Sequence, residues 1–179
     1  MLRLRLAGAD TLVTSPMCAR CPEGPAGCCA TPPAVAWSDV ARIVGHGGAA
    51  WLLAELSSGR LRPSPRGLAI VRVAAASGMP ARCGYLAPTG CALYPERPSA
   101  TCNYYLCNSA LDEALTAGDQ SVEPARHPQG LADRLGRVDL ALAVEVRERW
   151  PDGPPWDEGF LRWLEATSGP PLARLRLRP

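Results

Sequence analysis

Apolar residues recur at every third or fourth position in several stretches of this chain, which is the spacing of amphipathic helices. The longest of these stretches predicts a helix over about 130–150, which the sequence "PDGPP" ends. Its apolar stripe consists of Leu131, Leu135, Val138, Leu142 and Val146. Shorter stretches predict helices that begin at "SDVARIV" with Ser38 as N-cap, and over "AAWLLAELSS", "SALDEALTA" and "WDEGFLRWLEATSG".

The pattern changes between positions 60 and 75, where "RLRPSPRGLAIVRVAAA" predicts a short β-hairpin with "RPSPRG" as its turn. Residues 1–36 and the turn-rich stretch 83–107 show no such regularity, and we expect irregular structure there. The tail "PPLARLRLRP" is expected to form a short strand or a frayed end. Together these elements indicate a small α+β protein that is mainly helical. We expect a cysteine-rich domain over 1–118 and a helical extension over 119–179 packed on it, in a single globular unit.

Composition limits the cellular compartments and the kinds of chemistry that we expect for this chain. The chain has 179 residues, of which 47% are apolar, and a net charge of +2. This balance suits a globular domain and does not indicate nucleic acid or a membrane as a partner. No run of about 18 apolar residues is present, and the N-terminus lacks the apolar core of a secretory signal, so we expect a cytoplasmic protein with reduced thiols. All 19 basic residues are arginine, which excludes Schiff-base and P-loop lysine chemistry.

Eight cysteines form two groups in the segments of least regular pattern. They are Cys18, Cys21, Cys28, Cys29, Cys83, Cys91, Cys102 and Cys107. Disulfides are rare in the cytoplasm, and a redox pair at Cys18 and Cys21 would leave six cysteines unexplained. A CxxC turn lets two thiolates converge on one ion, so a metal is favoured. Both histidines, His46 and His127, lie outside the two groups. The ligands would therefore be thiolates, which favour zinc or iron–sulfur.

The adjacent Cys28 and Cys29 bear on the number of centres. In extended chain, neighbouring side chains point to opposite sides. The two cysteines would then serve different centres, or one would be a ligand and the other buried. Two four-thiolate centres would use all eight cysteines, but one four-cysteine cluster with spare thiols fits the count equally well. The spacing matches neither a ferredoxin nor a zinc ribbon, so zinc and iron–sulfur both stay open.

At the level of whole motifs, "CARCPEGPAGCC" followed by "CGYLAPTGCALYPERPSATCNYYLC" resembles the CxxCxxCC cysteine-cluster family, also called YkgJ-like. The likeness covers 18–107. It implies a zinc- or iron-chelating domain, often described as iron–sulfur, whose ligands are the eight cysteines. Larger relatives such as flagellin lysine methylases carry the cluster within an enzyme. This chain departs from the family at Asn103, where an arginine is usual, and at Leu106, where a proline is common.

Two residues between the later cysteines are candidates for binding the cofactor. Arg97 would donate hydrogen bonds to thiolates or nearby carbonyls and offset their negative charge. Tyr94 would belong to an apolar jacket over the site, together with Tyr85, Leu86, Leu93, Tyr104 and Tyr105. The sequence therefore predicts a metal-binding protein with an iron–sulfur centre, or zinc, in an electron-transfer or accessory role. A structural zinc module that binds a protein partner and a cluster-containing protein-modifying enzyme are the alternatives.

Overall fold

The computed structural model describes residues 2–5, 7–21, 27–74, 81–88, 90–93, 97–119 and 129–175. Within them the fold is α+β and mainly helical, as the sequence predicts. The α-helices are α1 (Trp37–Gly45), α2 (Ala49–Ser57), α3 (Ala100–Tyr104), α4 (Asn108–Thr116), α6 (Gln129–Arg149) and α7 (Glu158–Ala173). Three 3-10 helices occur near the N-terminus: η1 (Gly8–Asp10), η2 (Pro16–Arg20) and η4 (Cys28–Ala30). Among these described residues, no helix is long and apolar enough to cross a membrane.

Among the residues that the structure describes, the strands are short and each strand pair is antiparallel. β1 (Arg3–Arg5) pairs with β2 (Leu12–Thr14), and β5 (Gly67–Ile70) lies between β3 (Val35–Ala36) and β4 (Leu61–Ser64). β6 (Arg72–Val73) pairs with β7 (Arg82–Cys83), and β8 (Leu86–Ala87) with β9 (Gly90–Cys91). The β4–β5 hairpin confirms the predicted one. The expectation of irregular structure over 1–36 is wrong at β1 and β2, where three-residue strands pair across a tight 3-10 turn.

Gly67 is where the hairpin meets β3. Its φ is +118°, and a Cβ added there would lie 2.4 Å from the backbone oxygen of Val35. A glycine is therefore required for β3 to approach β5 so closely.

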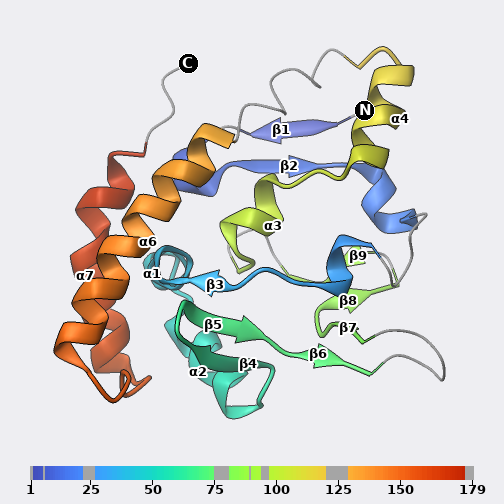
Figure 1. Cartoon of the computed structure of the whole chain (residues 1–179). Coiled ribbons are helices and arrows are strands. Elements are labelled where there is room, and N and C mark those ends of the chain that lie inside the picture. Colours follow the sequence, from blue (N-terminus) through green and yellow to red (C-terminus); the bar gives the residue numbers. More distant parts are fainter. Residues whose placement is uncertain are drawn as a thin grey trace.

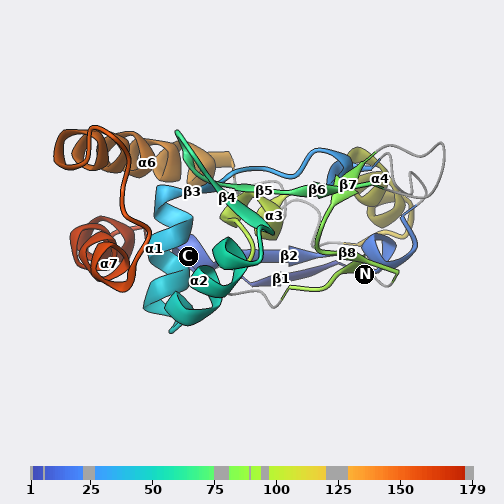
Figure 2. The ribbon, with the colours of Figure 1, turned by 90° about the horizontal axis from the view of Figure 1, so that it is seen from below.

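Helix α1 runs through the middle of the molecule, between the sheet and the pair of helices α6 and α7 (Figures 1 and 2). Its residues from Trp37 to Val44 are all buried. The prediction that Ser38 caps this helix is wrong, because the N-cap is Ala36, two residues earlier, and the helix begins at Trp37. The side chain of Asp39 accepts the Ala36 N–H at 3.0 Å and takes over the capping role.

The predicted stripe of α6 is confirmed as a buried face. Leu131, Leu135, Leu142 and Val146 are buried, and Leu142 and Val146 join Phe160, Leu161 and Leu164 of α7 in the main core. That core also contains residues of α1 and of the β3–β5–β4 sheet, so it draws on both sides of position 118. The connector over 120–128 lies outside the described residues.

Helix α7 continues further than its sequence suggests. Asp157 caps its start by accepting the Phe160 N–H at 2.8 Å. The helix then includes Pro170 and Pro171 and ends at Ala173, so the expected strand or frayed end is wrong for this part of the tail. The following Leu175 is buried in a small core with Leu131 and Leu135. This packing stabilises the last turn of α7, although prolines inside a helix tend to break it.

Candidate metal centre

All eight cysteines lie in the described residues, and none is in a disulfide. Cys18 lies in η2, Cys28 and Cys29 in η4, Cys83 in β7, Cys91 in β9 and Cys102 in α3, while Cys21 is the C-cap of η2 and Cys107 is the N-cap of α4. In both views β7, β8 and α4 lie at the end of the molecule opposite α6 and α7 (Figures 1 and 2). Cysteines of both groups, separated by residues 30–82, therefore lie toward this end of the fold, while α3, with Cys102, lies nearer the middle (Figures 1 and 2).

Local packing joins the early cysteine segments to the later ones. Turn η4 packs against β7, and η2 packs against β9. An ion pair between Arg20 and Glu113, with Nη2 and Oε1 2.5 Å apart, links the Cys18–Cys21 turn to α4. Both partners are largely exposed, so this pair adds little stability. The arrangement brings together thiols that the sequence places far apart.

The adjacent thiols of Cys28 and Cys29 contact each other. A hydrogen bond from the Cys29 thiol is the largest influence on Cys28 and lowers its pKa to about 6. The same contact, with burial, raises the pKa of Cys29. The contact therefore favours the thiolate form of Cys28 and the protonated form of Cys29.

The other shifted thiols identify their neighbours. Burial raises the pKa of Cys18, and the thiols of Cys28, Cys107 and Cys21 add to the effect. Burial also raises the pKa of Cys83, to which Cys91 and then Cys28 contribute. Cys102 has a pKa raised to about 11, again chiefly by burial, with further contributions from Cys91 and Cys83. Each of these cysteines thus has other thiols within electrostatic reach.

Across the described residues, no group of three or more His, Cys, Asp or Glu side chains is arranged to hold a metal ion. The donor set fits zinc or iron–sulfur by its chemistry, because it consists of thiolates grouped at one end of the fold. The thiols do not converge on one point in this conformation. A bound ion would have to draw them together, and the short turns and two-residue strands that carry them are the elements that would move.

Arg97 lies against helix α2 in this structure. Its guanidinium carbon is 5.6 Å from the centroid of the Trp51 ring. Its Nη1 is buried without a hydrogen-bond partner among the described residues. The absence of a side chain at Gly48 leaves room for this nitrogen. Tyr94, the second predicted cofactor-binding residue, lies outside the described residues.

The residues of the predicted apolar jacket differ in their burial. Leu86 and Leu93 pack with Cys29 against the main core, in which Tyr85 is buried. Tyr85 also has a polar role, since its hydroxyl donates to Glu55 Oε2 at 2.6 Å. Tyr105 is 52% exposed.

Two buried acidic residues that the sequence analysis missed hold the cysteine segments in place. Glu55 of α2 accepts hydrogen bonds from Tyr85 and, at 2.6 and 2.5 Å, from Arg60, whose contact is the main cause of a lowered pKa of Glu55. Tyr85 follows Cys83 by two residues, so the contact attaches the Cys83 strand to α2. The available signal was an acidic residue inside the apolar run "AWLLAELSS".

Asp39 is the second of these residues. Besides capping its own helix, it accepts the Ala100 N–H at 2.7 Å and lies 3.9 Å from the buried Arg42. Arg42 in turn donates to the backbone oxygen of Pro98. These contacts attach α1 to the start of α3, which carries Cys102. Burial raises the pKa of Asp39 to about 6, against the opposing effect of Arg42.

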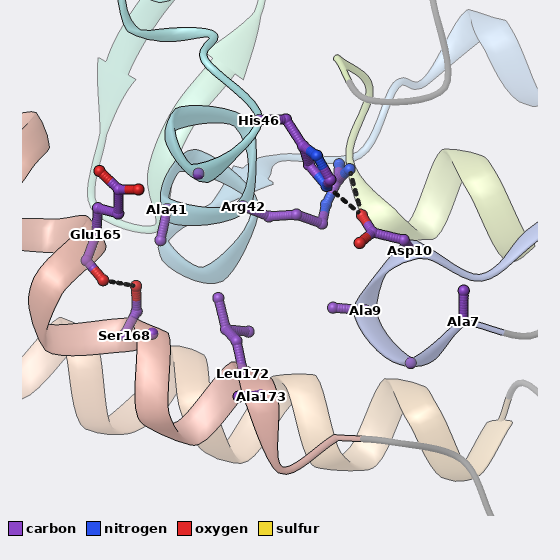
Figure 3. A pocket seen from close by; sticks show the side chains of 13 residues that line it. Ala7, Ala9, Asp10, Ala41, Arg42, His46, Glu165, Ser168, Leu172 and Ala173 are labelled. Atoms are coloured by element: carbon purple, nitrogen blue, oxygen red, sulfur yellow. Dashed lines mark hydrogen bonds and ion pairs between the residues drawn. The ribbon is translucent and has the colours of Figure 1, made fainter.

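A groove of about 370 Å³ lies between η1, α1 and α7 (Figure 3). At one side Asp10 accepts from His46 Nε2 at 2.9 Å and approaches Arg42 Nη1 at 3.4 Å. On the α7 side, the Ser168 hydroxyl donates to backbone oxygens of its own helix. Asp10 is thus paired with His46 and Arg42, and no cysteine lines this groove.

Comparison of the chain with protein-family models, with curated proteins and with solved structures finds no match. The likeness to the cysteine-cluster family therefore stays a prediction that rests on the motif residues.

Proposed function

We propose that this protein binds a metal through the thiolates at its cysteine-rich end, as an iron–sulfur centre or as zinc. The observation that supports the proposal is the packing of η4 against β7 and of η2 against β9, which gathers two distant groups of cysteines. Their thiols are also free of disulfides. A disulfide framework would pair these thiols, whereas a metal centre requires them as free thiolates.

The metal would stabilise the fold in addition to its functional role. The elements that carry the cysteines are two to five residues long, apart from α4, and hydrogen bonds within such short elements contribute little stability. Metal binding would supply free energy of folding to this end of the molecule. An iron–sulfur centre in that place would serve electron transfer or an accessory role, and it would require a protein partner. We place such a protein in a reducing compartment such as the cytoplasm.

Purification without oxygen followed by metal analysis tests the proposal. We expect metal in a stoichiometric ratio to protein. An iron–sulfur centre would make the protein brown, with absorbance at about 400 nm, and zinc would leave it colourless. Cys107→Ser is expected to lower the metal content. Asn108→Ser is the matched control, because it places the same new side chain at an adjacent exposed position and leaves every thiol intact. Wild-type protein that holds no metal, either as purified or after incubation with zinc, would contradict the proposal.

A further inference from the structure

The outer face of helix α6 carries an exposed apolar patch. Figure 2 shows α6 along the upper margin of the molecule, with α1 and α7 beneath it. Leu140 is 68% exposed, more than any other large apolar side chain among the described residues, and Val144 is 42% exposed. Side chains four positions apart lie on the same face of a helix, so these two form one patch. It points away from the buried Leu142, because two positions turn a helix by about 200°.

Gly136 extends this patch by one turn toward the start of α6. It is exposed, and a Cβ added to it would meet no other part of the described chain within 4 Å. Glycine destabilises the interior of a helix relative to alanine, and the packing of this chain does not require it here. The missing side chain would let a second helix approach α6 closely beside Leu140.

Charged residues of opposite sign lie along one flank of the patch. Arg137 is near the start of the patch and Glu148 is beyond its end, and the two side chains point in directions that differ by only about 20° around the helix. Both are exposed, and neither forms an ion pair within the described part of the chain. This flank is therefore positive at one end and negative at the other, which complements a copy of itself laid in the opposite direction.

We infer that α6 pairs with α6 of a second copy of this chain, in antiparallel orientation about a two-fold axis level with position 142. Leu140 of each copy then packs on Val144 of the other. The two-fold axis places the same flank of both copies side by side with reversed direction. Arg137 of each copy and Glu148 of the other then lie within about 1.5 Å of the same height along the helices, so two ion pairs form.

The charges also select this orientation. In a parallel pair, Arg137 of one copy and Glu148 of the other would lie about 16 Å apart along the helix axis and could not meet. On the opposite flank of the antiparallel pair, Arg147 of one copy lies over Gly136 of the other. The glycine that the chain itself does not require thus leaves room for a long side chain of the second copy.

The contact involves a single helix of 21 residues from each copy. Such an area is at the small end of specific interfaces, so we expect a weak dimer with a dissociation constant of about 100 μM. The chain is then monomeric at the micromolar concentrations of an unfolding experiment. No cysteine lies on α6, so the inference is independent of the proposed function.

Sedimentation velocity of the full chain, kept reduced, tests the inference over about 10 μM to about 1 mM. Wild type should change from monomer to dimer across this range. Arg137→Glu and Glu148→Arg should each weaken association at least about tenfold, because each variant creates two like-charge contacts. Arg62→Glu is the matched control. It makes the same change of charge at an exposed position of β4, across α1 from α6, and should dimerise as wild type does.

An equimolar mixture of Arg137→Glu and Glu148→Arg should associate again, because both contacts between the two different chains then join opposite charges. Both substitutions in one chain should restore dimerisation in the same way. Circular dichroism of each variant checks that its helix content is unchanged, and this recovery cannot come from misfolded chains. Wild type that stays monomeric at the highest concentration overturns the inference. Single variants that dimerise as tightly as wild type, or a mixture that stays monomeric, also overturn it, and each of these outcomes leaves the proposed function standing.

Discussion

Asp39 offers the sharpest test of how the fold positions the cysteine-rich end. The change Asp39→Ala removes the acceptor of two backbone N–H groups, those of Ala36 at 3.0 Å and Ala100 at 2.7 Å. It also removes the carboxylate that faces the buried Arg42. Loss of the Ala36 contact frees the start of α1. Loss of the Ala100 contact and of the charge facing Arg42 weakens the attachment of residues 98–100, and with them the helix that carries Cys102.

The magnitude follows from these contacts. A buried donor left without an acceptor costs about 1–3 kcal/mol. The Ala100 N–H becomes such a donor, whereas the Ala36 N–H is only partly buried and its loss costs less. Loss of one partner of a buried ion pair costs about 3–5 kcal/mol, reduced here because Arg42 keeps its contacts with Asp10 and Pro98. Since the two effects overlap, we expect a loss of about 3–4 kcal/mol, a large part of the about 5–15 kcal/mol that stabilises a domain.

Urea unfolding of the reduced, metal-free protein measures this loss as a shift of the midpoint at unchanged slope. Alkylation of Cys102 should accelerate in the variant, because α3 loses its anchor. Leu140→Ala is the matched control for a truncation at an exposed helical position, and it should change the free energy of unfolding by less than about 0.5 kcal/mol. A loss below about 1 kcal/mol for Asp39→Ala would refute the role given to this carboxylate.

The same residue gives stability a defined pH dependence. Burial raises the pKa of Asp39 to about 6 in the folded protein, against about 3.9 in an unfolded chain. Between these values the folded state binds more protons, so this group's contribution to stability falls as the pH rises from about 4 to about 6. Asp39→Asn cannot ionise. As the pH rises from about 4 to about 6, the free energy of unfolding of this variant should therefore increase relative to that of wild type. A difference that stays constant over this interval would contradict the reasoning.

Three further outcomes are expected. Tyr85→Phe removes a hydroxyl from the buried Glu55 and should cost about 1–2 kcal/mol in urea unfolding, whereas Tyr105→Phe, at an exposed position, should cost almost nothing. Gly67→Ala should lower the melting temperature much more than Gly59→Ala: both have positive φ, but only the Gly67 side chain would meet backbone atoms, so equal shifts would contradict the role given to the β3 contact. Chelation of the metal-loaded protein should lower the melting temperature, by about 2–4 °C for each kcal/mol of lost stability, and an unchanged melting curve would show that the metal does not support the fold.

Much of the secondary structure was predictable because its signals are local. The stripe of α6 and the alternating hairpin depend on residues within one element. Capping was less predictable: Asp39 replaced Ser38 because its carboxylate also reaches Ala100, which lies 61 residues further along the chain. The two prolines near the end of α7 indicated a helix stop, but the packing of Leu175 with residues of α6 outweighed that preference.

The candidate site divides in the same way. The eight thiols, their two groups and the question raised by Cys28 and Cys29 could all be read from the residues in order. Arg97 was expected beside the cysteines, whereas its observed neighbour is Trp51. Glu55 and Asp39 could not be assigned as anchors, because their partners are distant in sequence and become neighbours only after the helices pack.

By itself, then, the sequence determined which residues offer sulfur donors and where most helices lie, since both depend on residue type and on spacing within a few positions. Only the tertiary structure decided which thiols are neighbours. Packing of η4 on β7 and of η2 on β9 brings together segments whose sequence separation carries no information about their distance. The physical reason is that these contacts depend on the burial of apolar surface by the whole core, which no local pattern encodes.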